Sequence, residues 1–296
     1  MGARPLSFAD ANAPFEGAEF VLLGVPYDAT ASFRSGAKFA ANAIREASWN
    51  FESYMVDHGH DIAEVDVHDE GNIEEFARPQ DMLEAVQEVI EQIMDNGSFP
   101  ITLGGEHSLT PAIIKALKKK FDLGLIVLDA HMDFRDEYLN LKDSHACASR
   151  RMSDIVGPEN VVPIGVRSVS AGEIDDINKN FKGKFRHIDA FEVRKTGMEW
   201  AVKKALRWIK KRPIYLSLDV DSLDPAYAPG TGTPEPFGLS AWDVKECVRL
   251  LADRLVGFDI VEIAPIYDNG NTAALGARLI REVIMAVHKA KGSKKK

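Results

Sequence analysis

The chain alternates between two patterns of hydrophobic and polar positions. Short apolar runs predict buried strands at Phe20–Val25, Ile62–Val67, Pro100–Leu103, Leu123–Asp129, Val161–Val166, Phe185–Asp189, Ile214–Asp219 and Val256–Glu262. Apolar positions at helical spacing predict helices at Asp81–Asp95, Pro111–Lys120, Met198–Lys210, Trp242–Leu251 and Thr272–Ala290. Strands that alternate with helices are typical of a parallel sheet covered on both faces. We therefore predict an α/β fold with three layers, α/β/α, around a mostly parallel sheet of about eight strands.

Composition narrows the class of protein. No linker, low-complexity tract or internal repeat interrupts the 296 residues, which favours a single domain over residues 1–296. A formal net charge of −9 argues against an extended nucleic-acid surface, and no stretch is long and apolar enough for a membrane span. The first fifteen residues lack the apolar core of a signal peptide, and Cys147 and Cys247 are too few for a disulfide scaffold. We expect a cytoplasmic protein that binds neither nucleic acid nor membrane.

Residue types that bind metals follow three predicted strands at their carboxyl ends. They are His107, Asp129, His131, Asp133, Asp219 and Asp221. In two of the motifs these residues occupy alternate positions, and alternate residues of an extended chain point to the same side, so the members of each motif can converge. Carboxylates at the end of a buried strand are costly unless a positive charge lies among them. The pattern therefore predicts a pair of divalent metal ions.

The ligand types indicate which metals to expect. Four carboxylates and two imidazoles, without a thiolate, favour Mn²⁺, while Zn²⁺, Co²⁺ and Fe²⁺ remain alternatives because affinity order alone does not select the metal. Two ions that share bridging carboxylates would use all of these ligands and would form a common hydrolytic arrangement. A lone Asp-x-His or Asp-x-Asp is usually a solvated loop or a helix cap, but three such motifs after three apolar strands favour a metal centre.

These motifs resemble those of the ureohydrolase family, which includes arginases and agmatinases. The resemblance lies in Gly104–Ser108, Asp129–Asp133, Ser217–Pro225, Ala228–Glu235, Asp259–Pro265 and Ser35–Ala37. It implies a binuclear manganese hydrolase on a three-layer α/β/α fold that assembles as a homo-trimer or homo-hexamer. It also implies one Mn²⁺ held by His107, Asp129, Asp133 and Asp219, and a second held by Asp129, His131, Asp219 and Asp221.

The chain departs from the family pattern at two positions. Glu106 stands where many members have Asp, and Phe237 stands where a Gly-Gly pair is usual. Glu106 either orients the ring of His107 or a neighbouring residue, or has a purely structural role. Cys147, two residues after His145, is expected to be a small buried thiol.

The resemblance implies hydrolysis of a guanidinium group to urea and an amine. A guanidinium carbon is a poor electrophile, so activation of water by metals and stabilisation of the developing charge suit this reaction. The resemblance gives Asp133 a hydrogen bond to the nucleophile and gives His145 the role of proton shuttle. It also places Glu262 against the guanidinium, which pairs bidentately with a carboxylate. The alternatives are a capping or surface role for His145 and a local Lys or Arg partner for Glu262.

The loop Phe134–Asp143 bears on the substrate. It has no Thr/Ser-rich stretch to bind an anion, and the three carboxylates of Asp136, Glu137 and Asp143 would suit a cationic amine tail, although they also fit a solvated face. We therefore expect a small cationic guanidino substrate, agmatine, which would give putrescine and urea in polyamine biosynthesis. Aminopropylagmatine is a close alternative. Guanidinobutyrate, arginine, formiminoglutamate and a non-catalytic metal-binding role are less favoured.

Overall fold

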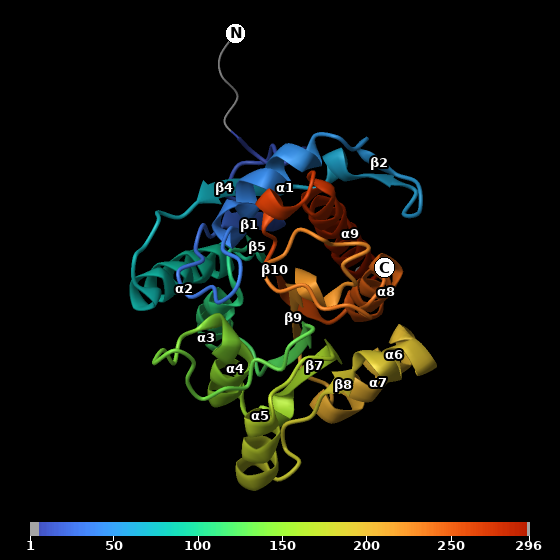
Figure 1. The fold of residues 1–296 in the computed structure, drawn as a ribbon. Helices are drawn as coiled ribbons and strands as arrows, with labels where there is room; N and C mark the ends of the chain where they lie inside the picture. The colour runs from blue at the N-terminus through green and yellow to red at the C-terminus, as the bar shows by residue number, and fades with distance from the viewer. Residues whose placement is uncertain (1–5, 295–296) are drawn as a thin grey trace.

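The computed structural model describes residues 6–294. These residues form three layers, with a sheet between two layers of helices (Figure 1). The sheet has eight parallel strands in the order β4-β1-β5-β10-β9-β6-β7-β8. Their bounds are β1 Phe20–Gly24, β4 Val67–Asn72, β5 Phe99–Leu103, β6 Gly124–Leu128, β7 Val161–Val166, β8 Ile188–Asp189, β9 Ile214–Asp219 and β10 Leu255–Val261. The predicted α/β class and the eight-stranded parallel sheet are confirmed.

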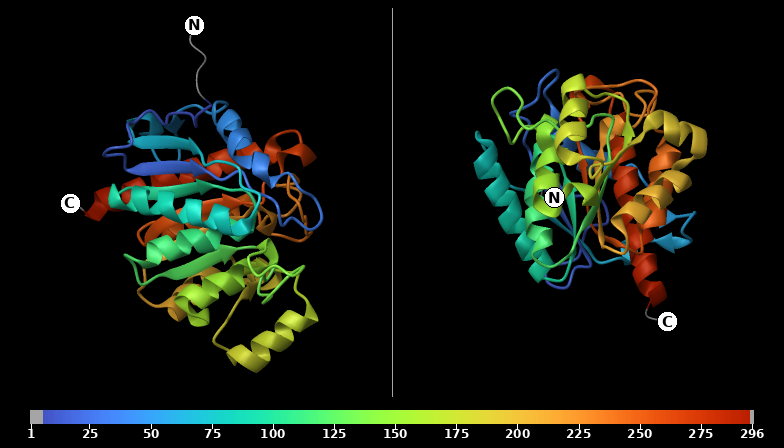
Figure 2. Two further views of the ribbon diagram at one scale, coloured as in Figure 1. Left: turned by 90° about the vertical axis from the view of Figure 1, so that its left-hand side faces the viewer. Right: turned by 90° about the horizontal axis from the view of Figure 1, so that it is seen from below.

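Helices cover both faces of the sheet, as the view from below in Figure 2 shows. One face carries α2 (Pro79–Asp95), α3 (Thr110–Lys118), α4 (Ala148–Val156) and α5 (Ala171–Asp176). The other face carries α1 (Ala40–Ser48), α6 (Ala190–Thr196), α7 (Met198–Ile209), α8 (Ala241–Leu251) and α9 (Asn271–Lys294). A small antiparallel hairpin of β2 (Tyr54–Met55) and β3 (His60–Asp61) lies outside the sheet. In the described part of the chain, no helix is long and apolar enough to cross a membrane.

The strands contribute to two hydrophobic cores, one on each face of the sheet. In β1, Phe20 and Leu22 belong to the core with α1 and α9, whereas Val21 and Leu23 belong to the core with α2 and α3. Successive side chains of a strand point to opposite faces, so a strand that is covered on both sides must be apolar at every position. This double burial explains the uninterrupted apolar runs in the sequence.

Two predicted strands differ from the structure. The prediction at Ile62–Val67 is wrong in register: Ile62–Glu64 forms a 3₁₀ turn, and β4 begins at Val67. The carboxylate of Asp61 accepts the backbone N–H of Ala63 at 3.0 Å and so stabilises the turn. The strand predicted at Phe185–Asp189 is only Ile188–Asp189, at the edge of the sheet. Short helices such as α1 and α4 were not predicted, because fewer than three turns give a weak periodic signal.

The order of the strands positions the chemical motifs. β5, β10, β9 and β6 are consecutive in the centre of the sheet. Each is followed at its carboxyl end by one of the polar motifs, which come from distant parts of the sequence. In open parallel sheets this edge is where ligands bind. The topology therefore brings four separate motifs to one place.

Candidate metal centre

The six predicted metal ligands lie together beyond the central strands. The Nδ1 atom of His107 lies 3.3 Å from a carboxylate oxygen of Asp129, 3.3 Å from one of Asp133 and 3.4 Å from one of Asp219. The Nδ1 atom of His131 lies 2.9 Å from Asp221 and 3.8 Å from Asp129. Asp129 thus belongs to both groups. This is the arrangement that two neighbouring ions with a shared ligand would need.

Turns, not extended strands, produce this convergence. β6 ends at Leu128, and the chain then bends so that Asp133 adopts a left-handed backbone conformation with φ of 50°. After β9, Val220–Ser222 forms a 3₁₀ turn in which the backbone N–H of Asp221 donates to Asp219 at 2.9 Å. The expectation that alternate positions of an extended chain would align the ligands is therefore wrong in its geometry, although the residues do meet. A left-handed conformation in a residue other than glycine stores strain and is common at functional sites.

The electrostatics of the cluster fit bound cations. Among the described residues, no Lys or Arg forms an ion pair with any of the four carboxylates, and the buried atoms His107 Nδ1 and Asp129 Oδ2 have no hydrogen-bond partner. Burial and the charges of Asp133 and Asp221 raise the pKa of Asp129 to about 7. Burial and neighbouring carboxylates also raise the pKa of Asp219 well above its usual range. Divalent cations would stabilise the ionised forms, so the oxygen and imidazole donors fit a binuclear metal site.

A buried hydrogen-bond relay orients His107. The hydroxyl of Ser217 donates to Asp259 at 2.6 Å and lies 3.1 Å from His107 Nε2. Tyr215 and Thr110 also donate to the other oxygen of Asp259, at 2.7 Å and 2.9 Å. Because the single proton of the Ser217 hydroxyl goes to Asp259, Ser217 accepts from His107 and Nε2 carries the proton. In the neutral ring, the Nδ1 atom then presents its lone pair to the carboxylate cluster, as a metal ligand must.

A pocket of about 290 Å³ opens onto the cluster. Asp133, His131, Asp219 and Asp221 line its floor, and His145 and Glu262 line it as well. The backbone N–H of His107 donates to Glu262 Oε1 at 2.7 Å, and Glu262 has a left-handed φ of 63°. Burial and the charge of Glu106 raise the pKa of the Glu262 carboxyl well above its usual range. All eight predicted site residues are therefore placed at or beneath one pocket.

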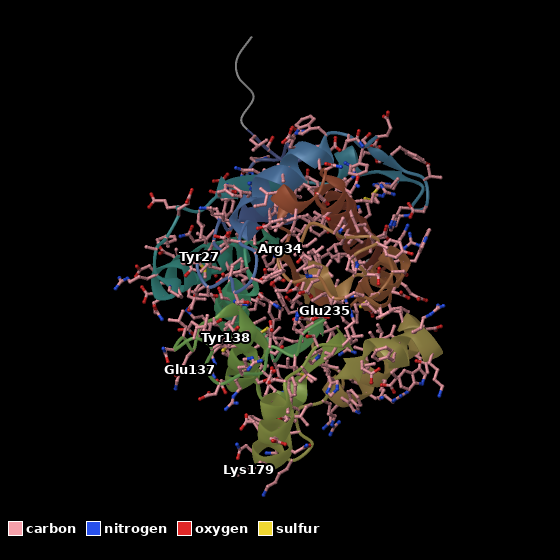
Figure 3. The ribbon with its side chains drawn as sticks, in the orientation of Figure 1. Tyr27, Arg34, Glu137, Tyr138, Lys179 and Glu235 are labelled. Carbon is pink, nitrogen blue, oxygen red and sulfur yellow. The ribbon has the colours of Figure 1, made fainter. Side chains whose placement is uncertain are left out.

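The acidic residues of the loop after Asp133 are not in this pocket. Asp136 pairs with Arg151 at 2.9 Å, and Asp143 accepts a hydrogen bond from Gln80 at 3.1 Å. Glu137 is exposed at the outer edge of the molecule (Figure 3). The prediction that these three carboxylates bind an amine tail is therefore wrong, because none of them lines the pocket.

Two other side chains of that region do line the pocket. Arg135 lies 3.6 Å from Glu173 and stacks over the ring of Tyr138, with 5.3 Å between guanidinium carbon and ring centre. Arg135 is the only Lys or Arg among the described residues that line the pocket. Glu173 accepts the backbone N–H of Phe134 at 3.0 Å and also caps α5 at Ser170. The positive charge of Arg135 is thus already compensated by an anchored carboxylate.

Sequence reasoning missed several residues around the site. Thr30 and Ser32, from the loop after β1, contact the imidazole of His145, and no spacing pattern marks them. Asp259 offered a usable signal, because a carboxylate inside an apolar strand must be satisfied by buried donors. Phe237 has no role predicted from the sequence, and Cys147 is predicted to be a buried thiol. Phe237 is 78% exposed, and Cys147 is buried with its Sγ 3.8 Å from the carbonyl oxygen of Leu141.

The fold and the site together define a hydrolase class with a binuclear metal centre at the carboxyl edge of a parallel α/β sheet. The chain belongs to the arginase family of ureohydrolases, which it matches over residues 18–286. It is 36% identical to the agmatinase of Bacillus subtilis (strain 168), over 92% of each chain. It is 37% identical to the N(1)-aminopropylagmatine ureohydrolase of Thermococcus kodakarensis, over 93% of this chain and 92% of that protein. The crystal structure of agmatine ureohydrolase from Thermoplasma volcanium superposes with a TM-score of 0.93 at 40% identity, covering 98% of this chain and 97% of that one.

Proposed function

We propose that the protein is a manganese-dependent agmatinase, which hydrolyses agmatine to putrescine and urea. The observation that carries the proposal is the meeting of six ligand residues with Glu262 and His145 at one pocket. His107, Asp129, Asp133 and Asp219 would hold one ion, and Asp129, His131, Asp219 and Asp221 the other. When bound, the two ions would activate a water molecule and stabilise negative charge that develops during attack.

Glu262 is suited to bind the guanidinium group. Its Oε1 is fixed by the backbone N–H of His107 at 2.7 Å, and no described residue hydrogen-bonds to Oε2. A carboxylate held in this way can accept N–H donors from a planar guanidinium and orient its carbon toward the metal cluster. Gly105 allows its loop to pack closely against the backbone of Tyr27, because a Cβ at this position would overlap the carbonyl oxygen of Tyr27.

The reaction requires movement of protons at the pocket. The oxygen of water adds to the guanidinium carbon, the bond from that carbon to the alkyl nitrogen breaks, and both protons of the water finish on the leaving amine. The overall reaction is balanced without a net proton, since the guanidinium and the alkylammonium product carry the same charge. His145 lines the pocket and is the group placed to pass a proton to the leaving nitrogen. Asp133 would hydrogen-bond the attacking water.

The choice of agmatine rests on charge and on relatives. The one arginine that lines the pocket, Arg135, already pairs with Glu173, so the pocket offers a substrate carboxylate no free cation, which disfavours arginine and guanidinobutyrate. Two of the three relatives described above are named for agmatine, and the third for aminopropylagmatine at nearly the same identity. Aminopropylagmatine, which has a longer cationic tail, is therefore the second candidate. The proposal also includes a cytoplasmic location and assembly as a homo-trimer or homo-hexamer. Light scattering would test the oligomeric state.

The test is urea release by protein loaded with Mn²⁺, with kcat/KM compared for agmatine, aminopropylagmatine, arginine and guanidinobutyrate. We expect the highest kcat/KM for agmatine and at least a tenfold lower value for arginine. Highest turnover of arginine or guanidinobutyrate would contradict the charge argument and leave the hydrolytic centre intact. Absence of urea from all four, with two metals bound per chain, would refute the proposed reaction.

A further inference from the structure

The carboxylate of Glu106 binds Thr30 in the loop after β1. It is fully buried, and three donors converge on it. The backbone N–H of Thr30 donates to Oε2 at 2.8 Å, while the hydroxyls of Thr30 and Ser108 both donate to Oε1 at 2.6 Å. A carboxylate that receives three donors acts only as an acceptor. The neighbouring His107 is therefore not the residue that Glu106 orients.

The hydrogen bond from Thr30 to Glu106 determines how Thr30 interacts with His145. A threonine hydroxyl has one proton, which here goes to Glu106, so its lone pairs must accept from other groups. Two groups of His145 face this oxygen: the backbone N–H at 3.0 Å and ring Nδ1 at 3.1 Å. Nδ1 must therefore carry a proton. A second oxygen, Ser144 Oγ, lies 3.4 Å from Nδ1 and can accept the same proton.

The opposite ring nitrogen is then fixed as the basic one. A neutral imidazole has a single N–H, so protonation at Nδ1 leaves the lone pair on Nε2. Nε2 lies 3.2 Å from the hydroxyl of Ser32, and both residues line the pocket. The proton acceptor of His145 is thus on the side where the substrate would bind.

We infer that Glu106, acting through Thr30, is a positioning residue that selects the Nδ1–H tautomer of His145 and directs the Nε2 lone pair into the pocket. Only the catalytic role of this tautomer rests on the proposed function. A shuttle must accept and release its proton at the nitrogen that faces the substrate. The tautomer itself follows from hydrogen-bond geometry and can be measured without substrate or metal.

The substitution Glu106→Gln gives a sharp test. The backbone N–H of Thr30 can only donate, so the amide oxygen of glutamine must take the place of Oε2. The amide NH₂ group then takes the place of Oε1 and donates to the hydroxyl of Thr30. This hydroxyl is released to donate to Nδ1 of His145, which reverses the tautomer. Glutamine has nearly the same size as glutamate, so the variant separates positioning from a loss of packing. The hydroxyl of Ser108, which also donates to Oε1 in the parent protein, loses its acceptor, and Ser108→Ala controls for the loss of this bond.

The measurement is the ¹⁵N chemical shift of both ring nitrogens of His145 in metal-free, ¹⁵N-labelled protein, at a pH where the His145 ring is neutral. Signals are assigned by their absence in His145→Gln. We expect a protonated Nδ1 in the parent protein and a protonated Nε2 in Glu106→Gln. Ser108→Ala is the matched control, because it removes a donor to Glu106 without touching Thr30, and it should keep the parent tautomer. If Glu106→Gln does not fold, Thr30→Val is the second variant, and it should give a mixture of tautomers while Thr30→Ser restores Nδ1–H.

The expected kinetic effect of Glu106→Gln is a fall in kcat for agmatine of about 100-fold, with KM and bound Mn²⁺ little changed, since general acid–base groups contribute roughly 10²–10⁴-fold. A parent protein with protonated Nε2, or the same tautomer in parent and Glu106→Gln, would overturn the inference. These results do not depend on turnover. A tautomer that reverses as expected in a protein that releases no urea would support the positioning role and refute only the agmatinase proposal.

Discussion

Replacement of Ser217 by alanine tests how the protein prepares His107 for a metal ion. Ser217 is fully buried on β9 and is the only described partner of His107 Nε2, at 3.1 Å. The substitution removes one oxygen and leaves a buried N–H without an acceptor. Asp259 keeps its bonds from Tyr215 and Thr110 at Oδ2 but loses the Ser217 donor at Oδ1, so the change affects both the imidazole and this carboxylate.

The expected size of the effect follows from the unsatisfied donor. A buried N–H that loses its partner costs about 1–3 kcal/mol. Groups that orient a metal-binding histidine typically contribute about 10–100-fold to metal affinity, which is roughly 1.4–2.8 kcal/mol. The first figure applies to the free energy of unfolding and the second to metal binding. The Ser217→Ala protein should therefore bind the more weakly held Mn²⁺ about 10–100-fold less tightly.

The assay is calorimetric titration of the metal-free protein with Mn²⁺, together with thermal unfolding before and after loading. The matched control is Ser153→Ala on α4, since Ser153 is also buried but its hydroxyl has no hydrogen-bond partner among the described residues. The control should bind Mn²⁺ like the parent protein. Affinity of Ser217→Ala within threefold of the parent would refute the claim that this relay orients His107.

Four further outcomes follow from the same geometry. Asp129→Asn should lose both metals and urea release, because Asp129 belongs to both ligand groups; elemental analysis that finds one tightly bound metal would contradict a bridging role. Glu262→Gln should keep its metals but lose about 100-fold or more in kcat/KM for agmatine, since a buried charge-assisted pair to the guanidinium is lost, and an unchanged kcat/KM would exclude this contact. Removal of metal by a chelator should lower the midpoint of thermal unfolding, and Mn²⁺ at about 100 times its Kd should restore about 2.7 kcal/mol for each site that it fills; differential scanning calorimetry would detect a failure to recover. The hydrogen bond and charge of Lys245 outweigh burial and lower the pKa of Asp57 to about 2. This stabilisation is present above the unfolded-state pKa and is lost as the pH falls through about 2. Asp57→Asn should therefore lower the free energy of unfolding at pH 7 by about 1 kcal/mol after allowance for solvent screening, and denaturant titrations should show the difference from the parent narrowing below about pH 4.

The sequence alone determined the fold class and the candidate ligands. Strands buried on both faces must be apolar throughout, as β6 and β9 are, so their runs are visible without a structure. The ligand motifs are also local, because Asp129, His131 and Asp133 lie within five consecutive positions. A ligand motif whose residues are close in the sequence can be recognised without a structure.

The tertiary structure alone decided which side chains support those groups. Thr30 and His145 are 115 positions apart, and His107 and Ser217 are 110 apart, yet each pair shares a hydrogen bond. In the loop after Asp133, the sequence showed the acidic residues but did not show that Arg151 forms an ion pair with Asp136. A hydrogen bond or ion pair depends on distances of a few ångströms between atoms. Those distances are set by how the strands are ordered in the sheet, which local patterns of residues do not specify.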